Sequence, residues 1–173
     1  TRRHRVGGQQ RLAWYRCWVL LELVDLRPNS SDDRWWVPPF ADDVDYEHPH
    51  WWNRQLGEEP WFVQVLDQTG TEVARVEFDD PGGINPEYAN VPNIGVERLE
   101  IQFLEVAAGA RGRGVGGRVV RSLMERHPDR RLFAYSEGAD RFWKSLGWEA
   151  FDHPAGGYRT LFIQSPGGLR SAL

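Results

Sequence analysis

The sequence predicts a single α/β domain built around a mixed sheet. Three patterns support this fold class: a hairpin-like pair of apolar stretches around Gly70, an alternating stretch over 96–106, and an apolar stripe at helical spacing after it. Strands come in a run and are followed by strand, helix, strand, helix and strand, the order of a mixed α/β sheet. At 173 residues, the chain has the length of one domain and can bury a substantial core.

The first half of the chain supplies the strands that come in a run. Residues 14–28 are largely apolar and predict a long strand that ends at Pro28. Residues 29–60 are rich in Pro, Trp and acidic side chains, which predicts irregular structure with one or two short helices. Residues 61–78 predict a hairpin, because Gly70 stands in a turn between two apolar runs. Residues 80–93, rich in Pro, Gly and Asn, predict a loop.

The second half alternates strands and helices. Residues 96–106 predict a strand, and a stripe of Val and Leu after the glycine-rich turn predicts a helix that stops before Pro128. Residues 131–136 predict a short strand, 139–146 a short helix with Gly147 at its C-cap, and 158–164 a last strand. Strict alternation over 96–106 separates two sets of side chains, Leu99, Ile101 and Phe103 on one face and Glu100, Gln102, Leu104 and Val106 on the other.

Composition narrows the classes of function. The net charge of −4 and the pI near 5.7 argue against nucleic acid as a partner. Cys17 is the only cysteine, so we expect no disulfide framework and no cysteine metal cluster. No apolar run approaches the ~20 residues of a membrane helix, and no signal-like segment follows the basic start, so we expect no membrane partner and a cytoplasmic location. We expect residues 1–12 to form a flexible basic arm and 13–173 to form the domain.

The stretch "EVAAGARGRGVGGRVVRSL" (105–123) runs from a predicted strand through a glycine-rich turn into a predicted helix. The unpaired N–H groups of a helix N-terminus bind anions, and glycines let a phosphate approach the backbone. The turn therefore predicts a phosphate cradle, although a plain strand–turn–helix with solvated arginines would give the same pattern. A P-loop is excluded, because no G-K-[ST] closes the motif.

Two phosphate motifs overlap in this turn. Gly112, Gly114 and Gly117 spell G-x-G-x-x-G, the dinucleotide fingerprint, and Glu137 stands where a ribose-binding acid would follow. Arg111 instead begins R-x-x-G-x-G. The dinucleotide interpretation is weak, because too little chain follows the turn and a five-residue spacer separates the strand from the first glycine. It also leaves a second motif, "GADRFWKSLGW", unexplained.

That second motif completes a resemblance. "FLEVAAGARGRGVGGRVVRSLMER" followed by "AYSEGADRFWKSLGWEAF" resembles the GNAT superfamily of acyl-CoA-dependent N-acyltransferases. The strand ending at Val106, the four-residue spacer and R-x-x-G-x-G match the first family motif. The second motif matches at Ala139, Trp143, Lys144, Leu146, Gly147 and Trp148. The resemblance is specific over 99–151 and implies one domain with a mixed, largely antiparallel sheet flanked by helices, whose splayed strands form a cleft for CoA.

The resemblance implies acetyl-CoA, or another acyl-CoA, as co-substrate. The pyrophosphate would lie on the glycine turn, and the pantetheine arm would pair with the end of the 96–106 strand, where a backbone N–H would stabilise the oxyanion. The residues implied in cofactor binding are Leu104, Glu105, Val106, Arg111, Gly112, Arg113, Gly114, Val115, Gly116, Gly117, Ser136 and Trp143.

The resemblance also implies two catalytic positions. Glu100 stands where the family often has its general base, and burial would raise its pKa toward a useful range, although an ordinary strand carboxylate would look the same. Glu105 lies on the opposite face by alternation and is the weaker candidate. Trp143 replaces the Tyr that usually protonates the thiolate, and an indole N–H cannot supply a proton. Tyr135, Ser136 or water could replace it, or the protein binds acyl-CoA without efficient turnover.

The acceptor is expected to be a small-molecule amine or a protein amine, bound by a monomer or a homodimer. Trp35, Trp36, Trp51 and Trp52 together with Asp42, Asp43, Asp45 and Glu47 could bind a cationic amine, or could plug the edge of the core. His48 and His50 lie near acids, but we expect no metal site because a third ligand is missing. A non-catalytic acyl-CoA-binding or interaction module on the same fold is the alternative function, and Trp143 keeps it open.

Overall fold

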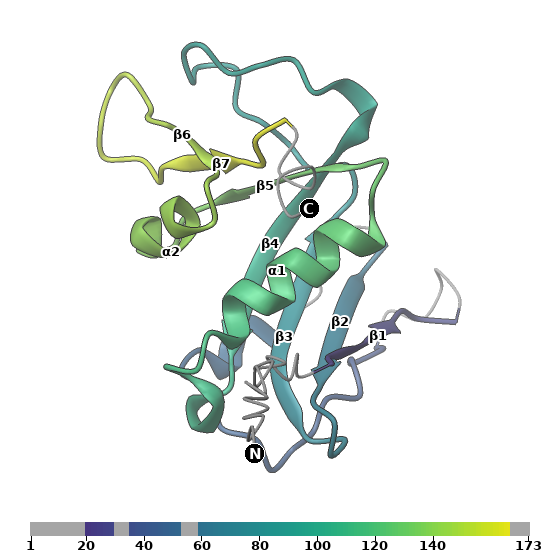
Figure 1. Cartoon of the computed structure of the whole chain (residues 1–173). Coiled ribbons are helices and arrows are strands. Elements are labelled where there is room, and N and C mark those ends of the chain that lie inside the picture. The colour runs from purple at the N-terminus through teal and green to yellow at the C-terminus, as the bar shows by residue number, and fades with distance from the viewer. Residues whose placement is uncertain (1–19, 30–34, 53–58, 167–173) are drawn as a thin grey trace, which may run out of the picture.

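A computed structural model describes residues 20–29, 35–52 and 59–166 (Figure 1). Seven strands in these residues form one sheet in the order β1-β2-β3-β4-β5-β7-β6. β4 and β5 run parallel, and every other neighbouring pair is antiparallel. The predicted mixed, largely antiparallel sheet is therefore confirmed. None of the helices in these residues is long and apolar enough to span a membrane. The expected arm over 1–12 lies outside the described residues.

The first strands follow the predicted order. β1 spans Glu22–Leu26, inside the predicted strand, whose residues 14–19 lie outside the described part of the chain. The predicted hairpin is confirmed as β2 (Trp61–Leu66) and β3 (Glu72–Asp79). Gly70 has φ +78°, the left-handed region that favours glycine, and this explains why glycine stands in the turn. One short 3₁₀ helix, Pro49–Trp52, lies in the segment predicted to be irregular.

The second half contains β4 (Arg98–Val106), α1 (Val115–Arg126), β5 (Arg131–Tyr135), α2 (Asp140–Ser145) and β7 (Leu161–Ile163), all within predicted elements. Two more 3₁₀ turns, Gly95–Glu97 and Ala108–Ala110, flank β4. β6 (Glu149–Phe151) was not predicted, because three residues carry no alternation and only its pairing with β7 defines it.

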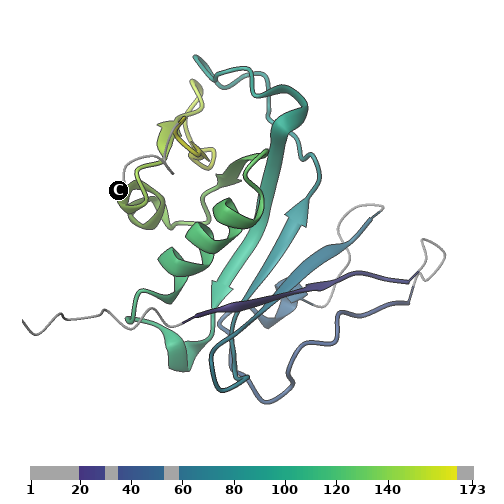
Figure 2. The ribbon, with the colours of Figure 1, turned by 45° about the vertical axis from the view of Figure 1, so that its right-hand side comes forward.

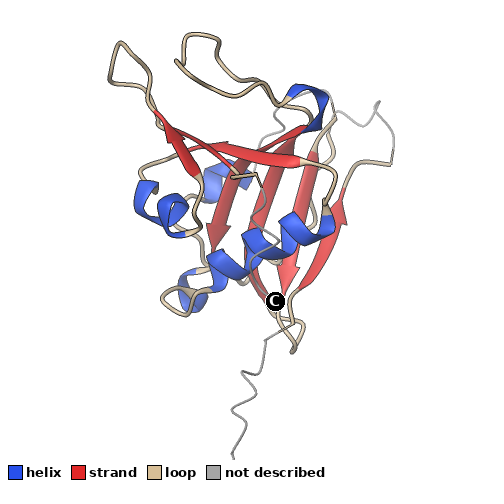
Figure 3. Cartoon of the chain, turned by 45° about the horizontal axis from the view of Figure 1, so that its top comes forward, coloured by secondary structure: helices blue, strands red, loops and turns tan. Residues whose placement is uncertain are grey.

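The two faces of the sheet are covered by different parts of the chain. α1 lies across one face, and α2 lies on the same side (Figures 2 and 3). The apolar side of α1, with Val119, Val120 and Leu123, packs there against β2, β3 and β4 in the largest core cluster. On the other face, Trp52 from the 35–52 segment packs with Phe62 and Phe103. A third cluster joins Tyr88 and Ile94 of the 80–95 loop to β5 and β7.

A β-bulge in β4 overturns the strict alternation that the sequence predicted. Glu77 pairs with Phe103 but Phe78 pairs with Ile101, so Gln102 has no opposite residue on β3. Ile101 therefore packs toward α1, whereas Phe103 packs on the opposite face with Trp52. An extra residue inserted into one strand reverses the faces of the residues beyond it. Leu104 and Val106 consequently face α1, and Glu105 lies on the face opposite α1, as Glu100 does.

The strands β4 and β5 separate beyond their first residues. Their pairing covers only Arg98–Arg131, Leu99–Leu132 and Glu100–Phe133. β4 then continues for six more residues toward Val106, while β5 turns to pair with β7. In the described residues, the β5-side edge of β4 therefore has no strand partner beyond Glu100. The expected splay of two central strands is confirmed, and it opens the sheet beside the N-terminus of α1.

Candidate active site

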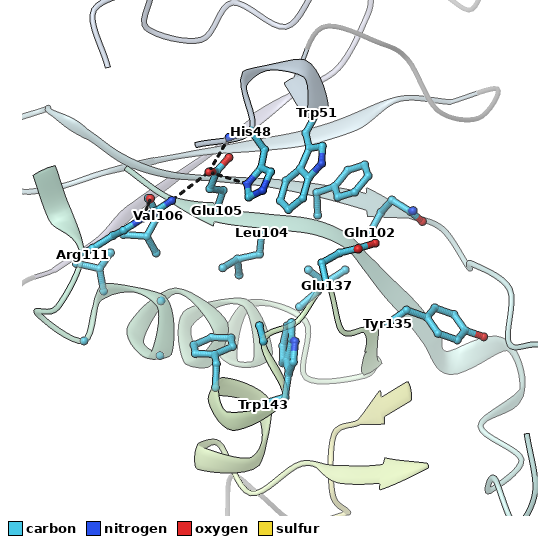
Figure 4. Close-up of a pocket in the computed structure, with 18 of the residues that line it drawn as sticks. His48, Trp51, Gln102, Leu104, Glu105, Val106, Arg111, Tyr135, Glu137 and Trp143 are labelled. Carbon is cyan, nitrogen blue, oxygen red and sulfur yellow. Dashed lines mark hydrogen bonds and ion pairs between the residues drawn. The ribbon is translucent and has the colours of Figure 1, made fainter. Parts of the chain in front are cut away.

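A cavity of about 400 Å³ lies where β4 and β5 diverge (Figure 4). Its walls come from four parts of the chain: the free edge of β4, the glycine turn with the first turn of α1, the α2 region, and the 48–51 segment. Sequence-predicted residues that line it are Leu104, Glu105, Val106, Arg111, Gly112, Gly114, Val115, Gly116, Gly117 and Trp143. The structure thus brings together ten of the thirteen predicted site residues; Glu100, Arg113 and Ser136 lie outside the lining.

The glycine turn presents backbone to this cavity. Gly112 and Gly114 have φ of +73° and +71°, so both need the left-handed region that glycine adopts without strain. Gly114 is the N-cap of α1, and it has no side-chain capping hydrogen bond. The first N–H groups of a helix have no partner inside the helix and carry a partial positive charge. This wall of the cavity can therefore bind an anion through main-chain donors.

Gly116 and Gly117 have a packing role as well. A Cβ atom built on Gly116 would lie 3.1 Å from the ring of Phe142 and 3.4 Å from Val106, and one on Gly117 would lie 3.2 Å from the Arg121 guanidinium. The absence of side chains lets α1 start close against β4 and α2. The two glycines therefore bring the elements around the cavity together.

The arginines of the turn do not all face the cavity. Arg111 turns to the 47–48 side: it donates to the backbone oxygen of Val106 at 3.1 Å, and its guanidinium pairs with Glu47 at 2.6 Å and Glu105 at 3.1 Å. Arg113 donates to the backbone oxygen of Gly109 and does not line the cavity. The expectation that both arginines contact phosphates stays a prediction.

Glu105 anchors the 47–52 segment to β4. Its carboxylate is buried and accepts hydrogen bonds from the backbone N–H groups of Glu47 at 2.8 Å and His48 at 3.1 Å, and from the Trp52 indole at 3.2 Å. The Nδ1 atom of His48 lies 3.2 Å from the same carboxylate. Glu47, His48 and Glu105 each bring one oxygen or nitrogen within 4.8 Å of the others, but the Arg111 guanidinium is the cation that pairs with both carboxylates.

Glu100 is buried beneath the 80–95 loop. The Gly83 N–H donates to its Oε2 at 3.2 Å, and a Cβ on Gly82 would lie 2.5 Å from the Glu100 Cβ, so the loop backbone lies directly on the side chain. Burial raises the pKa of Glu100 to about 7, an effect that the Gly83 hydrogen bond partly opposes. Its expected role as general base stays a prediction.

Packed aromatic rings surround Trp143, the residue that the resemblance places at the position of the usual acid. Trp143 is buried in the cavity wall between Phe142 and Trp148, with ring centroids 4.9 and 4.8 Å away. Tyr135 also lines the cavity, but its hydroxyl accepts from the Asn85 N–H at 2.9 Å and donates to the Gly83 carbonyl at 3.2 Å. Figure 4 shows this hydroxyl pointing away from Leu104 and Trp143.

Ser136 serves the local structure at the start of α2. Its buried hydroxyl accepts the Ala139 N–H at 2.9 Å, and its own N–H donates to the Thr160 carbonyl at 2.9 Å. Both contacts hold the turn between β5 and α2, and the expected contact with the cofactor stays a prediction.

The four tryptophans considered for an acceptor site have different environments. Trp51 lines the cavity, whereas Trp52 is buried beneath the sheet and Trp35 is 91% exposed. Trp36 packs at the edge of the cluster around Trp52. His48, expected only as a possible metal ligand, lines the cavity together with Phe103 and Glu137. Neither spacing nor composition gives a signal for His48 and Phe103 at this site, because tertiary contacts bring them to the cavity.

Comparisons with known proteins identify the family. The family model described as the acetyltransferase (GNAT) family matches residues 27–148, and a search of curated proteins finds no match. Similar solved structures include an acetyltransferase from Thermus thermophilus (14% identity, 61% of this chain and 63% of that chain, TM-score 0.47). A GCN5-related N-acetyltransferase from Kribbella flavida is also similar (25% identity, 60% of this chain and 65% of that chain, TM-score 0.38). So is a structure described as a bacterial toxin (18% identity, 83% of this chain and 90% of that chain, TM-score 0.48). The two acetyltransferases are covered over less than two-thirds of their length.

Proposed function

The chain belongs to the acetyltransferase (GNAT) family, and we propose that it transfers an acyl group, most simply acetyl, from an acyl-CoA to an amine. The observation that carries this proposal is the cavity that joins the free edge of β4 to the N-terminus of α1. One end offers unpaired main-chain donors for phosphate, and the other offers an open strand edge.

The cavity supports one orientation for the donor. The CoA pyrophosphate would lie against the backbone of Gly112 to Gly117, beside the first N–H groups of α1, which have no partner inside the helix. The pantetheine arm would extend along β4 past Val106 and Leu104, using the strand edge that β5 leaves free. A main-chain N–H in this stretch would polarise the thioester carbonyl and stabilise the oxyanion of the tetrahedral intermediate.

The acceptor would approach from the face opposite α1. Trp51, Phe103 and His48 form the cavity wall on that face. A small-molecule amine or a protein amine would place its nitrogen against the thioester carbon, form the C–N bond and expel the CoA thiolate. The resemblance predicts that Glu100 removes the amine proton, and its raised pKa supports that role, whereas its cover by Gly82 and Gly83 does not.

A non-catalytic acyl-CoA-binding module is the second candidate, and Trp143 favours it. This buried indole lines the cavity at the position where the family usually has an acidic hydroxyl. Thiolates are good leaving groups, so the loss of a general acid should slow transfer more readily than abolish it.

CoA release from acetyl-CoA, followed with a thiol reagent, tests the proposal. The full chain is assayed with spermidine, glycinamide and a lysine-containing peptide that has a free N-terminus. We expect release above hydrolysis with at least one amine, and mass spectrometry should find the acetylated product. Tight acetyl-CoA binding without amine-dependent release, by the wild type and by Trp143→Tyr, would support the binding module and contradict the enzyme.

A further inference from the structure

We propose that His48, oriented by the buried carboxylate of Glu105, accepts the proton of the acceptor amine. This inference rests on the proposed acyl transfer and names the group that activates its nucleophile. Three observations point to His48 as this group. Its imidazole lines the cavity, its Nδ1 atom lies within hydrogen-bond distance of Glu105, and its ring stacks on Trp51, which stacks on Phe103 of β4.

The carboxylate behind His48 is fixed before any substrate binds. Glu105 is 4% exposed, and the backbone N–H groups of Glu47 and His48 both donate to its Oε1 atom. These hydrogen bonds hold the carboxylate at one position. Nδ1 of His48 lies 3.2 Å from that oxygen, so the imidazole can donate its Nδ1 proton to Glu105 and keep Nε2 as an acceptor.

Stacked rings set the orientation of the imidazole. The His48 ring lies on the Trp51 ring with centroids 4.1 Å apart and planes 8° from parallel. Trp51 in turn stacks on Phe103 of β4, with centroids 4.6 Å apart and planes 18° from parallel. Figure 4 shows the His48 and Trp51 rings side by side above Leu104, on the side of the cavity opposite Trp143. A side chain held by its neighbours in this way loses little freedom when substrate binds.

The free nitrogen of His48 is open for chemistry. The side chain of His48 is 38% exposed, and its Nε2 atom has no hydrogen-bond partner within the described ranges. Among the described residues, the charged or titratable groups that contact the ring or its partner carboxylate are Glu105 from β4, Arg111 from the glycine turn, and Glu47 and His50 from its own segment, and Glu137 lines the same cavity. The Arg111 hydrogen bond and charge hold the pKa of the Glu47 carboxyl below its usual range, so Glu47 stays ionised and pairs with Arg111.

The proposed step balances its protons and electrons. The lone pair of a neutral amine forms the C–N bond, and the carbonyl π electrons move to oxygen. The surplus proton on nitrogen passes to Nε2 of His48, whose imidazolium is stabilised by Glu105. When the oxyanion reforms the carbonyl, the C–S bond breaks and its electrons leave with the CoA thiolate. The imidazolium then releases its proton to solvent, and the thiolate takes one up.

Three variants of the full chain test this step with acetyl-CoA and the best of the three amines. His48→Gln should lower kcat by about 100-fold or more, because general base catalysis contributes roughly that factor, while the acetyl-CoA Kd stays within about twofold. His50→Gln is the matched control: His50 is an exposed histidine two residues away that contacts the His48 ring edge-on but does not line the cavity, so its kcat should fall far less than that of His48→Gln. Glu105→Gln should lower kcat at least about tenfold while the KM for the amine and the acetyl-CoA Kd stay within about twofold, because Glu105 orients the base and is not proposed to contact either substrate.

The possible results separate the two proposals. If wild type releases CoA with an amine but His48→Gln keeps its kcat, the proposed dyad of His48 and Glu105 is wrong and the proposed function stands. The dyad is also wrong if Glu100→Gln abolishes turnover while His48→Gln does not, which would assign the proton to Glu100. If wild type turns over none of the amines, the proposed function and the dyad fail together. A Glu105→Gln variant whose amine KM and acetyl-CoA Kd rise as much as its kcat falls would leave Glu105 a purely structural anchor and overturn its positioning role.

Discussion

The two walls of the cavity are built from different chemical material. The glycine side (the free edge of β4 and residues 107–117) offers main-chain groups, and most side chains of residues 107–117 are small or absent. The aromatic side (residues 35–52) offers side chains, held by buried carboxylates at Glu72 and Glu105. The glycine side needs glycine at fixed positions, so it leaves a motif in the sequence. The aromatic side is assembled from several residue types at distant positions, so it leaves no such motif.

The largest effect should come from the buried ion pair that supports the aromatic side. Arg75 and Glu72 pair at 2.6 Å with side chains 10% and 1% exposed, and Glu72 also accepts the Ala41 N–H and the Tyr46 hydroxyl. Arg75→Met should destabilise the fold by about 3 kcal/mol, because it leaves a buried carboxylate without its cation. Urea unfolding measures this loss.

A surface pair provides the control for that measurement. Arg126 pairs with Asp25, with side chains 34% and 36% exposed, so Arg126→Met should cost less than about 1 kcal/mol. Equal losses in the two variants would contradict the supporting role of the buried pair. Folded Arg75→Met should still bind acetyl-CoA, because Arg75 belongs to the aromatic side alone.

The next effect tests the glycine side. Gly114→Asp should weaken acetyl-CoA binding by about 100-fold or more, roughly 2.7 kcal/mol, because it places a carboxylate beside the proposed pyrophosphate site. Gly157→Asp is a matched control: both glycines have φ +71°, and a Cβ on either meets nothing within 4 Å, but Gly157 does not line the cavity. Calorimetric titration of both variants compares them. Unchanged affinity in Gly114→Asp would remove the phosphate cradle from the account.

Glu100 allows a smaller test, of pH dependence. Its folded-state pKa of about 7 lies above the unfolded value of about 4.3. Between these values the folded state holds one more proton than the unfolded state, so the free energy of unfolding falls as pH rises toward 7 and then stays constant. Glu100→Gln should remove this loss. The free energy of unfolding of the variant, relative to that of the wild type, should therefore rise by on the order of 2 kcal/mol from pH 4.5 to pH 8. A constant difference between variant and wild type across this range would show that the carboxyl is not buried as described.

The smallest effect should follow from removing an exposed tryptophan of the aromatic side. Trp35 is 91% exposed, so Trp35→Ala should change stability by no more than about 0.5 kcal/mol and leave acetyl-CoA binding unchanged. Thermal unfolding and calorimetry measure both quantities. A tenfold loss of amine-dependent turnover in this variant would place Trp35 in the acceptor site after all.

The same contrast explains what the sequence could predict. The hairpin, the helix α1 and the cradle at Gly112 to Gly117 were predictable, because periodicity and glycine spacing are local signals. The bulge at Gln102 was not, since it depends on pairing with β3 and leaves no mark on the alternation of β4. It moves Glu105 to the face opposite α1, where the 47–52 segment meets it. The dyad of His48 and Glu105 joins positions 57 residues apart, and no pattern in one sequence connects them.

Hydrogen–deuterium exchange with and without acetyl-CoA tests whether the donor is bound by main-chain N–H groups. Saturating acetyl-CoA should slow exchange in two stretches, 101–106 on the free edge of β4 and 112–117 at the start of α1, while the hairpin β2–β3 is unaffected. If acetyl-CoA protects other segments and leaves 112–117 unchanged, the glycine turn does not bind the pyrophosphate.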